Sequence, residues 1–341
     1  MSTQRASWWS RRELLGRLTL AGTAGLLGLR SGAFAVEPPP ETMTLRLVVR
    51  PGSVCTAPIY LAEEFLQAEG FTDVQYVKKE VTLRSRQAVA AGEGHVTLVF
   101  SAPTIVHIDA GDPIVLLAGI HVGCLELFAT DRVGAIRDLK GKTVAVPDLG
   151  GTQHVFLVIM VTHVVLDARK DINWVTHPNP EAMRLLAEGR IDAFLAIPPE
   201  AQELRAKKIG HVVVNSMMDR PWSQYFCCMV TANREFVQKH PVATKRALRA
   251  IMIATDVCAL EPERAARFLV DKGYTSRYDY ALQVMQEIPY GKWREYNPED
   301  TLRFYALRLQ EAGMIKSTPQ KIIAQGTDWR FLNELKKELR G

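Results

Sequence analysis

Short apolar runs alternate with amphipathic stretches along the chain from about residue 44 onward. "LRLVV" (45–49) and "HVTLVF" (95–100) are continuous apolar runs of strand length, and each is followed by a stretch with helical spacing. Pro58 opens one such stretch and Gly70 ends it, the usual placement of these residues at helix ends. Short loops between alternating strands and helices predict an α/β fold with mainly parallel sheets.

The alternation forms two units. The first has predicted strands at 45–49, 74–77, 95–100, 114–118 and 125–129, with helices at 59–68, 86–91 and up to 110. The second begins near "IRDLKGKTVAV", with strands at 143–146, 172–176, 191–196 and 211–214, and helices at 154–167, 180–188 and 198–207. Residues 222–231 are predicted to be extended. The pattern then becomes helical, with helices predicted at 241–260, 262–272, 277–286, 298–312 and 327–339.

The N-terminal residues have the features of an export signal. Twelve uncharged residues separate Arg17 from Arg30, whereas a membrane-spanning helix needs roughly 20. Arg11 and Arg12 precede this run, and Ala33-Phe34-Ala35 provides a small-residue cleavage site. We therefore expect residues 1–35 to be a signal peptide of the twin-arginine type, and the remainder to be soluble in the periplasm.

Charge and cysteine content narrow the possible functions. The chain has 42 basic and 37 acidic residues, but residues 1–35 contain five Arg and one Glu, so the remainder has a net charge of only +1. This balance provides no basic face for nucleic acid. The five cysteines follow no CxxC or zinc-ligand spacing, so neither a disulfide framework nor a metal site is predicted.

Five segments together resemble the periplasmic solute-binding proteins of ABC importers, in the nitrate/sulfonate/taurine and thiamine-pyrimidine branch. They are "PGSVCTAPIYLAEEFLQAEGF", "AVAAGEGHVTLVFSAPTIVHIDAGDPIVLLAGIHVG", "IRDLKGKTVAVPDLGGTQHVFL", "LLAEGRIDAFLAIPPEAQEL" and "ANREFVQKHPVATKRALRAI". The resemblance implies lobe 1 at 43–130 plus 229–341, lobe 2 at 131–228, two hinge crossings and a helical C-terminal extension. It also implies a monomer without cofactor that closes over a small organic solute and delivers it to a permease and its ATPase.

Candidate ligand-binding residues follow from the position of the loops. In open α/β sheets, ligands bind beyond the carboxyl ends of the strands, where helix N-termini offer free N–H groups. The loops after the predicted strands and the two crossings therefore supply the candidates: Ser53, Cys55, Thr56, Ser101, Thr104, His121, Cys124, Glu126, Gly151, Thr152, His154, Glu200, Trp222, Tyr225 and Cys227. Each residue taken alone fits a cap or turn role equally well.

These loops contain no Lys or Arg, and Arg84 is the nearest basic residue. They favour a neutral or heteroaromatic ligand, although backbone N–H groups could hold a sulfonate. Alternation along an extended 225–230 places Cys227 toward the cleft and Cys228 in the core. A soft-metal site from Cys55, Cys124 and Cys227 is chemically feasible, but no ligand spacing supports it.

Two other functions stay open. Thiamine-pyrimidine synthases of fungi resemble this chain and carry a C-C-C-F-C stretch where it has "YFCCM", but only Cys227 and Cys228 correspond. The sequence lacks HExxH, G-x-S-x-G, a Walker loop and a full dinucleotide fingerprint, so we expect no enzymatic activity. The second alternative is a solute-sensing binding protein without a transporter.

The export hypothesis is tested by N-terminal sequencing of the exported protein, which we expect to begin at Val36. Changing Arg11→Lys together with Arg12→Lys should trap the precursor in the cytoplasm, because the twin-arginine pair would be lost. Normal export of the double variant would contradict the twin-arginine route while leaving export itself in place.

Overall fold

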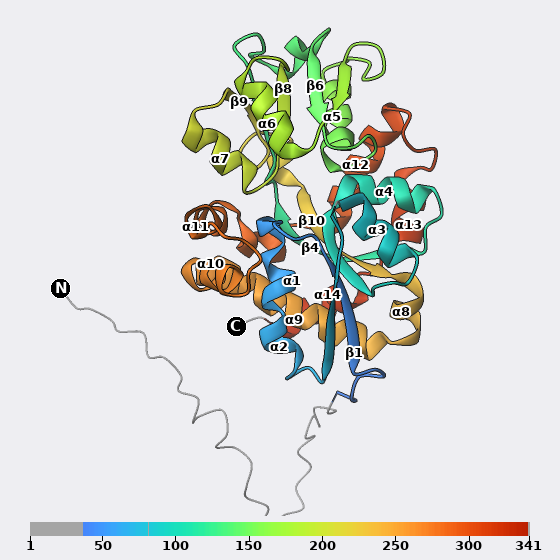
Figure 1. Ribbon diagram of the computed structural model, residues 1–341. Helices are drawn as coiled ribbons and strands as arrows, with labels where there is room; N and C mark the ends of the chain where they lie inside the picture. The colour runs from blue at the N-terminus through green and yellow to red at the C-terminus, as the bar shows by residue number, and fades with distance from the viewer. Residues whose placement is uncertain (1–36, 81, 340–341) are drawn as a thin grey trace, which may run out of the picture. The chain divides into compact units, whose positions relative to one another are not determined.

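Two five-stranded sheets organise the chain (Figure 1). This computed structural model describes residues 37–80 and 82–339, so the predicted signal peptide lies outside the described residues. The first sheet has the order β2-β1-β3-β10-β4 and the second β7-β6-β8-β5-β9. The strands are β1 (Thr44–Val49), β2 (Asp73–Lys78), β3 (Val96–Phe100), β4 (Ile114–Val122), β5 (Glu126–Ala129), β6 (Thr143–Val146), β7 (Asn173–Thr176), β8 (Ala193–Ala196), β9 (His211–Asn215) and β10 (Phe226–Asn233).

One strand in each sheet runs against the other four. β10 pairs antiparallel with both β3 and β4, and β5 pairs antiparallel with both β8 and β9. The remaining pairs, β1 with β2 and β3 and β6 with β7 and β8, are parallel. The predicted α/β class with mainly parallel sheets is confirmed. Each antiparallel strand is the one that enters its sheet from the other sheet.

Helices cover both sheets, which explains why β3, β4, β5, β8 and β10 are buried along their whole length. The α-helices are α1 (Ala57–Leu61), α2 (Glu63–Leu66), α3 (Thr82–Ala90), α4 (Ser101–Asp109), α5 (Thr152–His163), α6 (Asn179–Ala187), α7 (Glu200–Lys207), α8 (Arg234–Lys239), α9 (Pro241–Leu260), α10 (Pro262–Asp271), α11 (Tyr278–Glu287), α12 (Pro298–Glu311), α13 (Pro319–Gly326) and α14 (Arg330–Glu338). Short 3-10 turns lie at η1 (Val54–Thr56), η2 (Ile136–Leu139), η3 (Trp222–Gln224) and η4 (Tyr290–Arg294). None of the helices in the described residues has the length and apolar character needed to cross a membrane.

The structure corrects several predicted elements. The helix predicted at 59–68 is two short helices, α1 and α2, and α8 and α13 were not predicted. The stretch 222–224 forms the 3-10 turn η3 instead of extended chain. β5 pairs with β8 and β9, so it belongs to the second sheet, although the expected lobe 1 extended to residue 130. The division into two lobes stays a prediction, and on the strand pairing its first crossing lies at 123–125.

Aromatic rings join α5, which packs near the second sheet, to elements of the first. Phe156 on α5 makes edge contacts with Phe100, Trp222 and Tyr305, at ring-centroid distances of 5.0, 5.4 and 6.2 Å. Phe304 on α12 contacts Trp222 at 6.2 Å. We call these five residues the aromatic seam. Edge-to-face pairs of this kind add about 0.5–1.5 kcal/mol each beyond the area they bury.

Truncation of the central ring tests the aromatic seam. Phe156 is 1% exposed, so Phe156→Ala should lower the free energy of unfolding by about 3–5 kcal/mol. Leu307→Ala on α12 is the control, because Leu307 is 42% exposed and should change stability by less than about 1 kcal/mol. Denaturant unfolding of both variants is the measurement. Equal effects would contradict a stabilising role of the seam.

Candidate functional site

The first crossing between the sheets is a short turn with unusual backbone geometry. Gly123 has a φ of +57°, and a Cβ at this position would lie 2.5 Å from the Cα of Met217. Only glycine fits there. The next residue, Cys124, has a φ of +141°, a conformation that non-glycine residues rarely adopt. Strained residues of this kind cluster at functional sites, which makes Cys124 a candidate functional residue.

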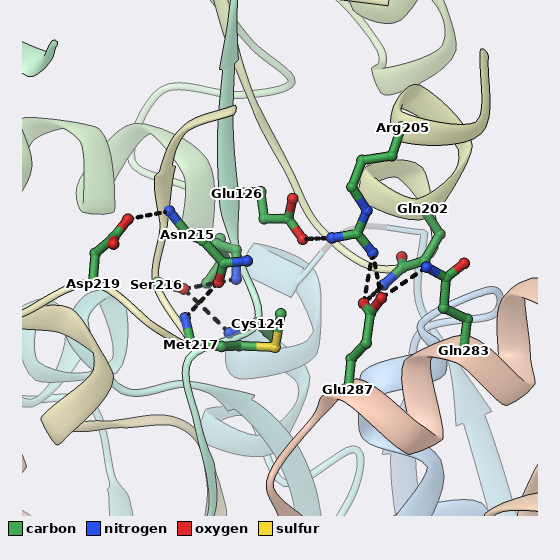
Figure 2. A network of polar contacts seen from close by, with 11 residues as sticks. Cys124, Glu126, Gln202, Arg205, Asn215, Ser216, Met217, Asp219, Gln283 and Glu287 are labelled. Carbon is green, nitrogen blue, oxygen red and sulfur yellow. Dashed lines mark hydrogen bonds and ion pairs between the residues drawn. The ribbon is translucent and has the colours of Figure 1, made fainter. Parts of the chain in front are cut away.

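Ser216, which follows β9 at the start of the return crossing, forms hydrogen bonds with the first crossing (Figure 2). The Ser216 hydroxyl oxygen accepts hydrogen bonds from the backbone N–H of Cys124 at 3.2 Å and of Leu125 at 2.9 Å. In the same turn, the Asp219 carboxylate accepts a hydrogen bond from the N–H of Asn215, and the Asn215 side-chain oxygen accepts one from the N–H of Met217. The two crossings therefore form one hydrogen-bonded unit.

Four cysteines and one histidine meet beside these crossings. The Cys124 and Cys227 sulfurs lie 3.3 Å apart. The ligand-type atoms of Cys55, His121 and Cys228 all lie within 4.8 Å of one another, and so do those of His121, Cys124 and Cys227. We call these five residues the thiol cluster. All of them are at most 5% exposed, and they include four of the predicted site residues.

The prediction that Cys228 packs away from the site is wrong. Its sulfur lies within 4.8 Å of the ligand-type atoms of Cys55 and His121. The reason is a β-bulge: Phe226 pairs with Val122 and Cys228 with His121, so two residues advance on β10 for one on β4. A bulge breaks the strict alternation of side chains along a strand, and both neighbouring thiols reach the same cluster.

Burial and mutual contact shift the pKa values of the residues in the thiol cluster. Hydrogen bonds from the thiols of Cys124, Cys227 and Cys55 lower the pKa of the Cys228 thiol well below its usual value. Burial disfavours a charged His121, but the neighbouring Cys228 and Cys55 raise the pKa of its ring to about 10. Burial raises the pKa of Cys124 and Cys227. The surroundings therefore favour the charged forms of Cys228 and His121 and disfavour those of Cys124 and Cys227.

The predicted hydroxyl residues bond to the protein's own backbone. Thr56 donates to the carbonyl of Ser53 at 2.8 Å, and Thr104 donates to that of Phe100 at 2.9 Å. Ser101 donates to the carbonyl of Phe226 at 2.9 Å and so ties α4 to the return crossing. Ser53 lies 3.7 Å from the sulfur of Cys55, at the edge of the thiol cluster. These bonds fix the loops around the cluster.

The predicted residues on the second sheet lie at separate places. Gly151 and Thr152 begin α5, and the Asp148 carboxylate lies where a Cβ of Gly151 would be. His154 packs on Trp174 and lines a cavity of about 730 Å³ between α5 and the end of α12. Glu200 accepts a hydrogen bond from Asn179 at 2.9 Å and lines another cavity, of about 650 Å³.

The two aromatic candidates pack against other aromatic rings of the protein. Trp222 belongs to the aromatic seam, and Tyr225 stacks on Phe304 with a ring-centroid distance of 3.9 Å. Phe304 therefore covers one face of the Tyr225 ring.

Glu126 forms an ion-pair network with Arg205 and Glu287, which we call the latch, and it is not part of the thiol cluster (Figure 2). Nη1 of Arg205 on α7 pairs with Glu126 on β5, and Nη2 donates to both carboxylate oxygens of Glu287 on α11, at 2.7 and 2.6 Å. Gln202 and Gln283 donate to the same Glu287 carboxylate. Burial raises the pKa of Glu126, although Arg205 opposes this. The latch connects α7, which flanks the second sheet, to α11 among the C-terminal helices.

Sequence reasoning missed the most unusual cation, Arg86 on α3. Its side chain is fully buried, and none of its three guanidinium nitrogens has a hydrogen-bond partner in the described residues. Burial lowers the pKa of Arg86 to about 10, against the opposing charge of Asp148. Val89 and Ala90 follow Arg86 by three and four residues, and this helical spacing could have placed Arg86 on a buried face. Arg84, the basic residue that the sequence singled out, is exposed.

Comparison with known proteins identifies the relatives of this chain. Residues 39–269 match the NMT1-like family. No curated protein sequence matches significantly.

Solved structures show the fold. The periplasmic nitrate-binding protein NrtA from Synechocystis PCC 6803 is similar, with a TM-score of 0.76 and 16% identity, covering 89% of this chain and 90% of that one. The alkanesulfonate-binding protein SsuA from Xanthomonas axonopodis pv. citri, bound to MOPS, has a TM-score of 0.66 and 13% identity, with 86% and 100% covered. The aliphatic sulphonate binding protein SsuA from Escherichia coli has a TM-score of 0.65 and 14% identity, with 82% and 91% covered. The chain thus has the fold of periplasmic binding proteins.

The latch makes a testable contribution to stability. Glu287→Gln removes the carboxylate partner of Arg205 on α11 but leaves Glu126, so the free energy of unfolding should fall by about 1–2 kcal/mol. The control is Glu203→Gln, also on the latch helix α7, which breaks only a surface pair with Lys207 and should leave stability unchanged within error. Denaturant unfolding distinguishes the two. A Glu287→Gln variant as stable as the control would contradict the latch.

Proposed function

The chain belongs to the NMT1-like family, and from that premise we propose that it is the solute-binding component of an ABC importer that captures a small anion between two lobes. The lobes correspond to the two sheets with their helices. The solute is delivered to a membrane permease with its ATPase.

The observation that carries this proposal is the unpartnered charge of Arg86. A buried guanidinium without hydrogen bonds costs several kcal/mol relative to water unless an anion or other acceptor satisfies it. No ion pair joins Arg86 to Asp148 within the described residues, and one carboxylate oxygen of Asp148 is also buried without a partner. Arg86 is therefore available to bind a planar or tetrahedral oxyanion through its fork of N–H donors.

The position of Arg86 supports a ligand between the lobes. Arg86 belongs to α3, which is tied to β10 by a hydrogen bond from Asn233 to the carbonyl of Val89 at 2.9 Å. Asp148 follows β6 in the second sheet, at the carboxyl end where ligands bind in open α/β folds. The hydroxyl of Ser85, next to Arg86, is also buried without a hydrogen-bond partner among the described residues.

The structural relatives support a small anionic ligand. NrtA is named for nitrate and the SsuA proteins for sulfonates. The anion proposal departs from the neutral or heteroaromatic ligand that the loop composition favours, because Arg86 lies on a helix rather than in a loop. A sulfonate or another small oxyanion fits the proposed donor set.

The remaining predictions belong to the same proposal. We infer a periplasmic, monomeric protein exported through residues 1–35, with binding in place of enzymatic turnover. The loop candidates other than Glu126, His154, Trp222 and Tyr225, whose side chains bond or pack elsewhere, are proposed to surround the closed site. The thiol cluster is proposed to lie at its hinge. The latch and the aromatic seam would hold the closed form.

Charge removal at Arg86 tests the function. A thermal-shift screen of nitrate and small sulfonates should find a ligand that raises the melting temperature of the wild type without being converted. Arg86→Gln should weaken that ligand at least tenfold, whereas Arg84→Gln, an exposed change on the same helix, should not. Because Arg86 has no hydrogen-bond partner in the part of the chain that the structure describes, Arg86→Gln should not lower the melting temperature without ligand. Chemical conversion of the ligand, or equal affinity of both variants, would contradict the proposal.

A further inference from the structure

The thiol cluster has the composition of a soft-metal site. Its sulfurs come from separate segments: Cys55 from η1, Cys124 from the first crossing, and Cys227 and Cys228 from β10. His121 at the end of β4 belongs to both triads of ligand-type atoms. Thiolate sulfur with imidazole is the donor set of thiophilic cations such as Cu(I) and Zn(II). We propose that the thiol cluster binds one thiophilic d10 cation, and that this cation is Cu(I).

His121 is already oriented as a ligand. Its Nδ1 lies 2.9 Å from the carbonyl oxygen of Gly123, and because a carbonyl only accepts, Nδ1 is the donor. In the neutral ring Nε2 then offers its lone pair to a metal ion, and this atom is buried without a hydrogen-bond partner in the described residues. A metal-binding histidine typically donates its other N–H to a carbonyl in this manner.

Backbone constraints also position the sulfurs. The unusual φ of Cys124 and the two N–H bonds to Ser216 fix this residue within the crossing. The bulge in β10 turns both Cys227 and Cys228 toward the cluster. A strained residue and a β-bulge therefore bring the thiols together. Packing of the core alone requires neither feature.

Charge favours Cu(I) over Zn(II). The cluster is buried, so a net charge there is costly. With His121 as a neutral ligand, Cu(I) gives an uncharged site when one thiol of the cluster releases its proton to solvent. Zn(II) gives an uncharged site only when two thiols release their protons, so two adjacent thiolates would have to form in the buried cluster.

The spacing of the sulfurs suits a metal with a small adjustment. Two sulfurs bound to one tetrahedral ion at about 2.3 Å lie roughly 3.8 Å apart, and the Cys124 and Cys227 sulfurs lie 3.3 Å apart. A disulfide requires about 2.05 Å between the same atoms, a larger movement. Oxidation of this pair to a disulfide is the alternative that an experiment must separate.

This inference goes beyond solute transport and does not depend on it. The proposed anion ligand binds through Arg86, which is not part of the thiol cluster. Loss of anion binding in Arg86→Gln would therefore leave copper binding intact. Because every member of the cluster is buried, entry of the cation requires a transient local opening of the chain around the cluster.

The test is an anaerobic titration of the reduced full-length protein with Cu(I) in competition with a chromophoric chelator, and with Zn(II) in a parallel arm. We expect one equivalent of Cu(I) to be bound, with X-ray absorption showing sulfur and nitrogen ligands, and Cu(I) should displace any Zn(II). Cys228→Ser and His121→Gln should each weaken Cu(I) binding at least tenfold. Cys258→Ser, a buried cysteine outside the cluster, should bind as the wild type does.

Thermal melting of each metal-free variant establishes that it is folded. If Cys228→Ser does not fold, His121→Gln carries the test, and the X-ray absorption of the wild type tests the ligand set without any substitution. Absence of Cu(I) binding, binding unchanged by the cluster substitutions, or binding of Zn(II) alone would overturn the proposal. So would formation of a Cys124–Cys227 disulfide, detected by mass as the loss of two hydrogens, in a protein whose reduced form binds no copper.

Discussion

Everything around the candidate site depends on how the chain crosses between its sheets. β10 enters between β3 and β4, and β5 enters between β8 and β9, each antiparallel to its neighbours. A strand in the interior of a sheet is bonded on both sides, so the crossings cannot shift without breaking a ladder. The turns beside them, at Gly123–Cys124 and Ser216, therefore bring fixed side chains to one place.

Two of the interactions that join the sheets and their helices differ in kind. The aromatic seam buries apolar rings, and the latch pairs Arg205 with Glu126 and Glu287. Arg86 differs from both, because its guanidinium is buried without a hydrogen-bond partner among residues 37–80 and 82–339. The seam and the latch stabilise the packing of the two sheets without a ligand, because their groups already have partners. The buried charge of Arg86 costs free energy until an anion binds to it. This contrast is the physical basis for separating the structural residues from the proposed ligand residues.

The sequence was sufficient for the fold and for part of the site. Apolar runs and Pro and Gly at helix ends located most strands and helices, because these signals are local. The strand-end rule also selected Cys55, His121, Cys124 and Cys227, which the structure brings together. Glu126, His154, Trp222 and Tyr225 came from the same rule, but their side chains bond or pack elsewhere.

The failures have identifiable physical causes. Cys228 was assigned to the core because a β-bulge leaves no mark in the alternation of residues. The strand-end rule considers only loop residues, and it therefore passes over Arg86, which lies on a buried helix face. The contacts of Arg205 with Glu126 and Glu287 join residues about 80 positions apart, and no local pattern predicts such a pair.

Small-angle X-ray scattering, recorded with and without the anion identified by thermal shift, tests the central claim most directly. The account predicts that the radius of gyration of the wild type falls when the anion is added, because the two sheets close over Arg86, and that Arg86→Gln shows no such change at the same concentration. An anion that binds to the wild type by calorimetry and leaves the radius of gyration unchanged would contradict capture between closing lobes.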